Sequence, residues 1–304
     1  MSASTASAPV TALVLAGTRP GRPDPLAQMA GVSHKALLSI GGVPMVLRVI
    51  AALRDVPAIS RIAVCVDSPH VLADKLPPDI LLLPAQPGGP SASVLAGLAR
   101  FGTPLLVTTA DNALLQAAWV EEFLSAIQPQ SDMAACVATQ DAVQRAVPNT
   151  RRTYIRLADM TFSGCNMFLF KSAVSARVAD LWQRVEQNRK NPLRVALALG
   201  PLVLLRALTG RLTRAALYRR IVKLTGAQAE LVPLSDGRAA VDVHTPSAGG
   251  GPEHRAAAGP PINSCGKAAN RSAASPHYTG SMVSSRAGTS TMAPASHCPP
   301  SGGC

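Results

Sequence analysis

Residues 10–22 have the sequence VTALVLAGTRPGR, in which an apolar run passes directly into a loop of glycine, proline and arginine. The first part is typical of a buried strand and the second of a loop. Because similar runs recur, the sequence predicts an α/β fold in three layers, with a mostly parallel sheet between helices on both faces. Strands are expected at 61–67, 80–85 and 104–111, a short strand and turn at 35–42, and helices at 44–56, within 86–101 and at 117–127.

The second half of the chain departs from this alternation. Strands are expected at 132–139, 153–159 and 164–171, a largely helical stretch at 172–226, and closing strands at 230–236 and 239–243. From position 244 the sequence has almost no large apolar residues, so it cannot bury enough surface to offset its ordering entropy. We therefore expect a flexible N-terminus (1–8), one domain (9–243) with a basic helical insertion at about 174–226, and a disordered tail (244–304).

The net charge of +12 is unevenly distributed. Between Arg184 and Lys223 lie ten Lys or Arg residues and a single acid, Glu186. Such a stretch suits a peripheral contact with anionic lipid or a lipid-linked substrate, and it also suits a solvated helical cover over a substrate pocket. Since Tyr218 is its single aromatic residue, stacking of bases is not favoured and no nucleic-acid partner is expected.

The cysteines and the apolar runs indicate the expected cellular location of the protein. Cys65, Cys136 and Cys165 are isolated in apolar surroundings, as small core residues are, and no CxxC pair indicates a zinc or redox site. No basic residue precedes the first apolar run, and the longest apolar stretch, 195–205, is shorter than the roughly 20 residues that span a bilayer. A cytoplasmic location is expected.

Two loops at strand ends carry the candidate chemistry. Ligands of parallel α/β sheets bind at the carboxyl ends of the strands. In residues 15–22, glycines allow backbone N–H groups to approach phosphate, and arginines add charge, as Lys35 does further along. The spacing matches neither a dinucleotide fingerprint nor a P-loop. An ordinary turn with solvated arginines is the alternative.

Asp111 ends the strand expected at 104–111. A carboxylate in that position can hold Mg²⁺ against a triphosphate. Alternatively, Asp111 caps a helix that begins at Ala113.

Together these features resemble the MobA-like nucleotidyltransferases, relatives of molybdenum-cofactor guanylyltransferase and of sugar-phosphate nucleotidylyltransferases. The resemblance covers residues 11 to about 246 and implies a nucleotide-diphospho-sugar transferase-like fold. It rests on the LAG loop at 15–17, HKALLSIGGVPM at 34–45, GPSASV at 89–94, TTAD at 108–111 and SGCNMFLF at 163–170.

The resemblance also implies roles for the matching residues. Catalytic roles fall to Arg19, Lys35 and Asp111. Contacts with the nucleotide or the second substrate fall to Ala16, Gly17, Thr18, Gly89, Ser91, Ser93 and Asn166. Mg²⁺ would be held by Asp111 and Asp242.

The implied reaction transfers NMP from an NTP to a phosphorylated small-molecule acceptor and releases pyrophosphate. A glycosyltransferase of the same fold would want a D-x-D at the strand end, where this chain has Thr109-Ala110-Asp111. A non-catalytic nucleotide-binding or membrane-surface module is the third hypothesis. Two departures from the family pattern stand out: His34 replaces the usual proline, and His244 replaces a second acid before a missing closing helix, as a shifted reading frame would produce.

Overall fold

The computed structural model describes residues 8–18, 24–150, 152–188, 194 and 200–242. All of these residues belong to the compact unit Met1–Pro261. Arg19, His244 and the tail expected at 244–304 lie outside the described residues, as does most of the N-terminal segment expected to be flexible.

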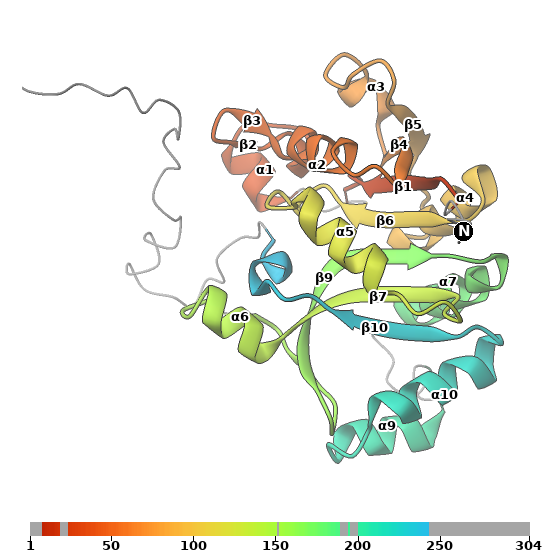
Figure 1. The fold of residues 1–304 in the computed structure, drawn as a ribbon. Helices are drawn as coiled ribbons and strands as arrows, with labels where there is room; N and C mark the ends of the chain where they lie inside the picture. Colours follow the sequence, from red (N-terminus) through yellow and green to blue (C-terminus); the bar gives the residue numbers. More distant parts are fainter. Residues whose placement is uncertain (1–7, 19–23, 151, 189–193, 195–199, 243–304) are drawn as a thin grey trace, which may run out of the picture. The chain divides into compact units, whose positions relative to one another are not determined.

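An eight-stranded mixed sheet occupies the centre of the unit (Figure 1). Its strand order is β10-β7-β9-β6-β1-β4-β5, and β8 pairs with β9. The strands are β1 (Val10–Leu15), β4 (Ile59–Val66), β5 (Leu81–Pro84), β6 (Leu105–Thr109), β7 (Met133–Thr139), β8 (Ile155–Arg156), β9 (Thr161–Phe170) and β10 (Ala229–Pro233). Every pairing is parallel except those that β9 makes with its neighbours, which confirms the predicted mostly parallel sheet.

Helices cover both faces of the sheet, as the sequence predicts (Figure 1). Side chains alternate along β1, so Ala12 and Val14 pack into one core and Leu13 into the other. The first core includes buried side chains of α2 (Met45–Arg54) and α5 (Ala117–Ala126). The second includes those of α4 (Pro90–Phe101) and α7 (Ala176–Gln187).

Three short helices lie at the connections: α1 (Pro25–Met29), α3 (Pro69–Ala73) and α6 (Gln140–Ala146). The stretch expected to be helical contains α7, α9 (Pro201–Leu208) and α10 (Arg214–Thr225), together with the 3-10 turn η2 (Ala173–Ser175). No helix in the described part is long and apolar enough to cross a membrane. Cys65, Cys136 and Cys165 are buried thiols of the core, as predicted.

Three local predictions were wrong. Lys35–Leu37 forms a 3-10 turn, η1, and the short strand is limited to β2 (Ser39–Ile40), which pairs with β3 (Val43–Pro44). Helix α6 was not expected; it forms because the Thr139 hydroxyl accepts a hydrogen bond from the Ala142 N–H and caps its first turn.

The third error concerns the closing strand expected at 239–243. Residues Gly237–Ala240 instead form a 3-10 turn, η3, which Asp236 caps by accepting from the Arg238 N–H. At Gly237 the turn packs directly against the backbone of α6: an added Cβ would lie 2.2 Å from the Ala142 carbonyl oxygen. This close approach turns the chain back toward the centre of the sheet, where Asp242 follows.

Candidate active site

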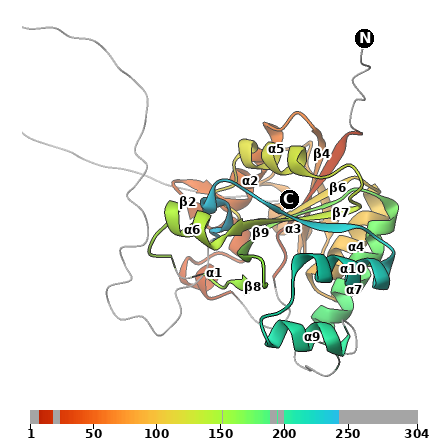
Figure 2. The same cartoon turned by 60° about the horizontal axis from the view of Figure 1, so that its bottom comes forward.

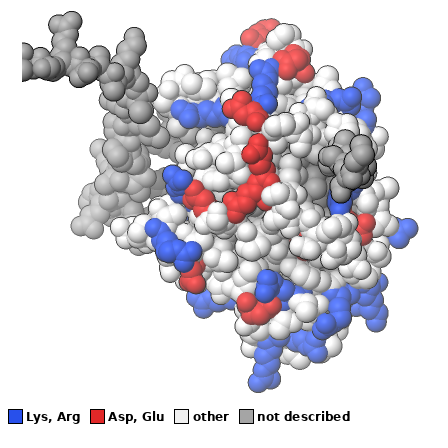
Figure 3. All heavy atoms as spheres, in the orientation of Figure 1, with Lys and Arg blue, Asp and Glu red and all other residues white. Residues whose placement is uncertain are grey.

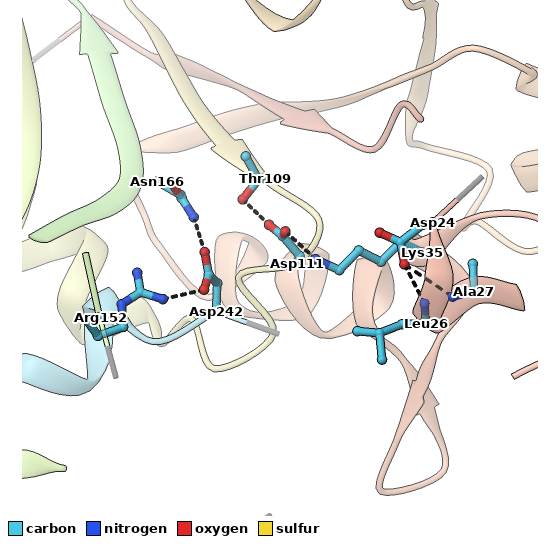
Figure 4. A network of polar contacts seen from close by, with 9 residues as sticks. All are labelled: Asp24, Leu26, Ala27, Lys35, Thr109, Asp111, Arg152, Asn166 and Asp242. Carbon is cyan, nitrogen blue, oxygen red and sulfur yellow. Dashed lines mark hydrogen bonds and ion pairs between the residues drawn. The ribbon is translucent and has the colours of Figure 1, made fainter. Parts of the chain in front are cut away.

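Asp111, Lys35 and Thr109 form a polar network at the end of β6 (Figure 4). The Asp111 carboxylate accepts hydrogen bonds from the Lys35 ammonium at 2.8 Å and the Thr109 hydroxyl at 2.6 Å. Both charged side chains are only partly buried, with 20% of Lys35 and 28% of Asp111 exposed, so a ligand can reach them. The helix-cap interpretation of Asp111 is wrong, because the next helix, α5, begins at Ala117 after Gln116.

Asp242, Asn166 and Arg152 form a second network. The Asn166 amide donates to an Asp242 oxygen at 3.0 Å, and the Arg152 guanidinium donates to the other oxygen. The side chain of Arg152 is 11% exposed and that of Asp242 is 21% exposed. Arg152 and Asp242 both lie outside helices and strands. The Asp242 carboxylate therefore joins both segments to Asn166 of strand β9.

Strand β9 bulges at Asn166. Ala135 of β7 pairs with Phe168 and Val137 pairs with Gly164, so Cys136 alone faces residues 165–167. Asn166 has a φ of 50°, in the left-handed region that asparagine tolerates better than most residues do. Strained backbone of this kind concentrates at functional sites, and here it aims the amide at Asp242.

The two networks are neighbours because β6 pairs with β9. Thr108 lies opposite Met167, which sets the next residue of β6, Thr109, beside Asn166. The Asn112 amide also donates to the Cys165 carbonyl at 3.3 Å. Figure 4 shows the two carboxylates facing the same part of the site, one from each network.

The loop after β1 approaches this site from the other side. Asp67, which follows β4, accepts hydrogen bonds from the Thr18 N–H and the Thr18 hydroxyl, each at 2.9 Å. Partial burial raises the pKa of Asp67, but the two Thr18 bonds, together with the bond from its own backbone N–H and the nearby His34, outweigh it and hold the pKa below the usual value. The His34 Nε2 lies 3.4 Å from the same carboxylate without forming a hydrogen bond. The β1 loop, through Thr18, and the residue before η1, His34, therefore both contact Asp67 at the end of β4.

Gly89, Ser91 and Ser93 lie at the start of α4. The Ser91 N–H and hydroxyl both donate to Glu186 of α7, and the Ser93 hydroxyl accepts from the Gln86 N–H at 3.0 Å. Ser91 and Ser93 are buried, so their hydroxyls bind other parts of the chain. The residue that follows β5, Ala85, adjoins the β1 loop, because a Cβ on Gly17 would lie 3.3 Å from Ala85.

These strand-end loops can be compared with known proteins. The sequence model of the MobA-like NTP transferase domain matches residues 12–231, more than half of the chain.

The chain belongs to the MobA-like NTP transferase family.

Membership gives the reaction class, which is nucleotidyl transfer. The fold is similar to that of a hypothetical transferase from Thermus thermophilus, at 28% identity and a TM-score of 0.66 over 78% of this chain and 97% of that chain. No curated protein matches the sequence.

Two other solved structures show lower similarity. One is a CMP:2-keto-3-deoxy-manno-octonic acid synthetase complexed with CTP, at 14% identity and a TM-score of 0.45 over 75% of this chain and 90% of that chain. The other is a 4-diphosphocytidyl-2C-methyl-D-erythritol synthase, at 13% identity and a TM-score of 0.43 over 79% of this chain and 94% of that chain.

The donor set of this MobA-like site fits a magnesium ion. Mg²⁺ prefers oxygen ligands and is usually held by one or two carboxylates together with substrate phosphates. Asp111 and Asp242 provide two carboxylates, which are ligands of the kind that Mg²⁺ prefers. Within the described ranges, no group of three or more His, Cys, Asp or Glu residues is placed to hold a metal ion. Substrate phosphates would therefore have to supply further ligands.

Several residues of the MobA-like site were missed by the sequence interpretation. Asp67 ends an apolar strand just as Asp111 does, so the same argument would have found it. Arg152 and Glu186 gave no such signal, because they lie far along the chain from their partners and meet them through tertiary packing alone.

Proposed function

We propose that this site transfers NMP from an NTP to a phosphorylated small-molecule acceptor and releases pyrophosphate. The observation that carries the proposal is the Lys35–Asp111 pair. It neighbours the Asn166–Asp242 pair because β6 pairs with β9, and His34, which precedes Lys35, contacts the same Asp67 that holds Thr18 of the β1 loop. A cation paired with a partly exposed strand-end carboxylate can contact anionic substrates.

The nucleotide would bind on the side of the β1 loop. Ala16, Gly17 and Thr18 would offer backbone to the nucleotide, and Arg19, outside the described residues, would contact the triphosphate. Gly89 would contact the base through its backbone, as would the residues around Ser91 and Ser93, because both serine hydroxyls are engaged. Lys35 would exchange part of its bond with Asp111 for a phosphate oxygen.

Mg²⁺ bound by Asp111, with Asp242 beside it, would supply Lewis-acid neutralisation of the triphosphate charge. The chain's own contribution is orientation. The Thr109 hydroxyl bond to Asp111 fixes one carboxylate rotamer, and Asn166 and Arg152 fix that of Asp242. Preorganised carboxylates of this kind need no rearrangement when charge develops.

The acceptor would bind on the side of β9. Asn166 would contact it, and the Arg152 guanidinium, whose Nε has no hydrogen-bond partner in the described part of the chain, would offer positive charge to its phosphate. An acceptor phosphate oxygen would then attack the α-phosphorus in line. A new P–O bond would form, the bond to the bridging oxygen of the β-phosphate would break, and pyrophosphate would leave.

The proposal includes a cytoplasmic location and a peripheral membrane contact through residues 184–223. The two other hypotheses predict different products. A glycosyltransferase would release a nucleoside diphosphate from a nucleotide-sugar, and a non-catalytic module would bind nucleotide without turnover.

A pyrophosphate-release assay tests the proposal. ATP, GTP, CTP and UTP are each supplied with Mg²⁺ and pooled sugar phosphates and alcohol phosphates. One NTP should support pyrophosphate release that requires an acceptor, and Asp111→Asn should abolish it without lowering the melting temperature. Asp180→Asn, at an exposed position of α7, is the matched control and should be fully active. Nucleotide binding with no pyrophosphate from any pair would contradict the proposal.

A further inference from the structure

Helix α9 presents an apolar stripe that no described residue covers. It has no buried residue, and Leu202, Leu205 and Leu208 are 58%, 58% and 77% exposed. Val203 packs against a small core that includes Leu212. At about 100° per residue, Leu205 lies about 200° around the helix from Val203, so the leucines face away from the protein. Figures 1 and 2 both show α9 at the margin of the described unit, away from the central sheet.

Positive charge borders this stripe. The side chains of Arg206 in α9, Arg211 in the α9–α10 connection, and Arg219 and Lys223 in α10 are exposed. The sequence from 187 to 229 contains no Asp or Glu to neutralise them. Lys and Arg side chains accordingly gather at the α9–α10 end of the molecule (Figure 3).

Helix α7 does not belong to this surface. Ala179 is buried, Trp182 packs against Phe168 with ring centroids 5.7 Å apart, and Glu186 accepts from Ser91. These contacts turn α7 toward the sheet and α4. Among the described residues after α7, helices α9 and α10 and their connection carry the exposed leucines and most of the exposed basic side chains; we call residues 201–223 the α9 patch.

We propose that the α9 patch docks on an anionic membrane surface, with the three leucines inserted among the lipid headgroups and the flanking basic residues paired with lipid phosphates. An amphipathic helix with exposed leucines and arginines binds the interface through buried apolar area and electrostatic attraction together. Long arginine side chains can lie along the apolar region while their guanidinium groups reach the headgroups.

Other partners fit the patch less well. Single-stranded nucleic acid needs aromatic platforms, but the Tyr218 hydroxyl is engaged in accepting from the Leu231 N–H at 2.9 Å. A second copy of the chain would bring like charges together. A helix of eight residues is also only about 12 Å long, small beside the roughly 800 Å² per partner of a standard protein interface.

The patch is tied to the acceptor side of the proposed site by one strand. The β8–β9 hairpin contacts the α9–α10 connection, where Ala158 N–H donates to the Leu212 carbonyl at 2.8 Å and Asp159 pairs with Arg214. Strand β9 then runs from Thr161 to Asn166, about 17 Å at the rise of an extended strand. A docked α9 patch would hold the acceptor side near the membrane surface, where a lipid-linked acceptor could enter.

Vesicle co-sedimentation of the full chain tests the proposal. Large unilamellar vesicles of phosphatidylcholine are compared with vesicles that also contain phosphatidylglycerol, over a range of NaCl concentrations. The protein should bind the anionic vesicles more tightly, and its affinity should fall as salt rises. Leu205→Asp with Leu208→Asp should weaken binding roughly a hundredfold. Arg206→Glu with Arg211→Glu should weaken it roughly thirtyfold.

Matched controls separate the patch from general surface properties. Leu81→Asp changes an exposed leucine of β5, and Arg61→Glu reverses an exposed charge of β4; both should bind vesicles as the wild type does. All the altered patch side chains are exposed, so melting temperatures should be unchanged. Vesicle binding rests on the membrane contact in the proposed function, which it narrows to residues 201–223, and it does not require nucleotidyl transfer. Asp111→Asn should therefore bind vesicles normally even if it loses transfer.

Three results would overturn the proposal. The first is equal binding to neutral and anionic vesicles. The second is retention of vesicle binding by both patch variants. The third is an absence of vesicle binding together with another kind of binding that the leucine variant loses. That other binding would be self-association, seen in sedimentation velocity, or binding of poly(U).

Discussion

Asp67 holds Thr18 by two hydrogen bonds, one from the backbone N–H and one from the hydroxyl, each at 2.9 Å. Forty-nine residues separate them in the sequence, yet β1 and β4 pair in parallel, so both lie where their strands end. The bonds fix the last described residue of the β1 loop before Arg19. His34 contacts the same carboxylate, and Lys35 follows it. Asp67 thus contacts the residues that directly precede Arg19 and Lys35, the two side chains proposed to bind the triphosphate, and we assign it a positioning role.

Asp67→Asn should raise the KM for the NTP by about tenfold while changing kcat little, because a looser β1 loop binds the triphosphate less well but leaves Asp111 in place. Steady-state pyrophosphate release measures both constants. Asp74→Asn, at an exposed position after α3, is the control. A fall in kcat with KM unchanged would contradict this positioning role.

The lowered pKa of Asp67 predicts a pH-dependent difference in stability. A carboxyl whose pKa is lower in the folded state stabilises the fold above its unfolded pKa, about 3.9, and this contribution disappears as the pH falls through the folded pKa. The melting temperature of the wild type should therefore be higher than that of Asp67→Asn at neutral pH. This difference in melting temperature should disappear below about pH 4. Calorimetric melting temperatures across this range test the sign. A gap that widens in acid would refute it.

Lys35→Ala should lower kcat/KM by about a hundredfold, because it removes the ammonium group that pairs with the Asp111 carboxylate. Lys75→Ala removes the same charge from an exposed position after α3 and should have little effect. Kinetic assays at several salt concentrations provide the comparison. If the two variants lose activity equally, general positive charge explains the effect and the specific phosphate contact is wrong.

Asn166 allows its two contributions to be separated. Asn166→Ala should be less stable than Asn166→Gly by about 1 kcal/mol, since alanine is strained at a φ of 50° and glycine is not. Both variants lose the amide that orients Asp242, so both should raise the KM for the acceptor and leave that for the NTP unchanged. Urea unfolding and two-substrate kinetics measure the two effects. Equal stability would mean that this backbone relaxes readily.

Gly237→Ala should destabilise the protein by about 1–3 kcal/mol, because the new Cβ would meet backbone atoms of α6 that cannot move alone. Activity should also fall at temperatures where the variant stays folded, since η3 leads to Asp242. Gly164→Ala in β9 is the control, as its Cβ would find nothing within 4 Å. Urea unfolding of both variants makes the comparison, and an unchanged Gly237→Ala would show that η3 can shift away from α6.

Much of the architecture was predictable from local patterns. The apolar run before Gly17 and the similar run before Asp67 predict buried parallel strands, because a strand covered on both faces needs apolar residues at every position. The residues at strand ends could be proposed as site residues for the same reason. Asp111 and Lys35 were found in this way, and they do meet.

Other features depended on contacts between distant residues. The helix-cap interpretation of Asp111 could not be rejected locally, because it depended on where the next helix begins, and the partners of its carboxylate, Lys35 and Thr109, became clear only in the fold. The replacement of the expected closing strand by η3 depended on how closely Gly237 approaches α6.

The sequence alone therefore determined where strands and loops follow one another along the chain, since apolar periodicity is a property of neighbouring residues. Tertiary structure alone decided which polar side chains share the site. It brought Arg152 to Asp242 across 90 residues and Ser91 to Glu186 across 95, and it left the leucines of α9 exposed among the described residues. The physical reason is that the burial pattern of a segment is encoded within it, whereas a hydrogen bond between segments depends on sheet register and packing, to which the whole domain contributes.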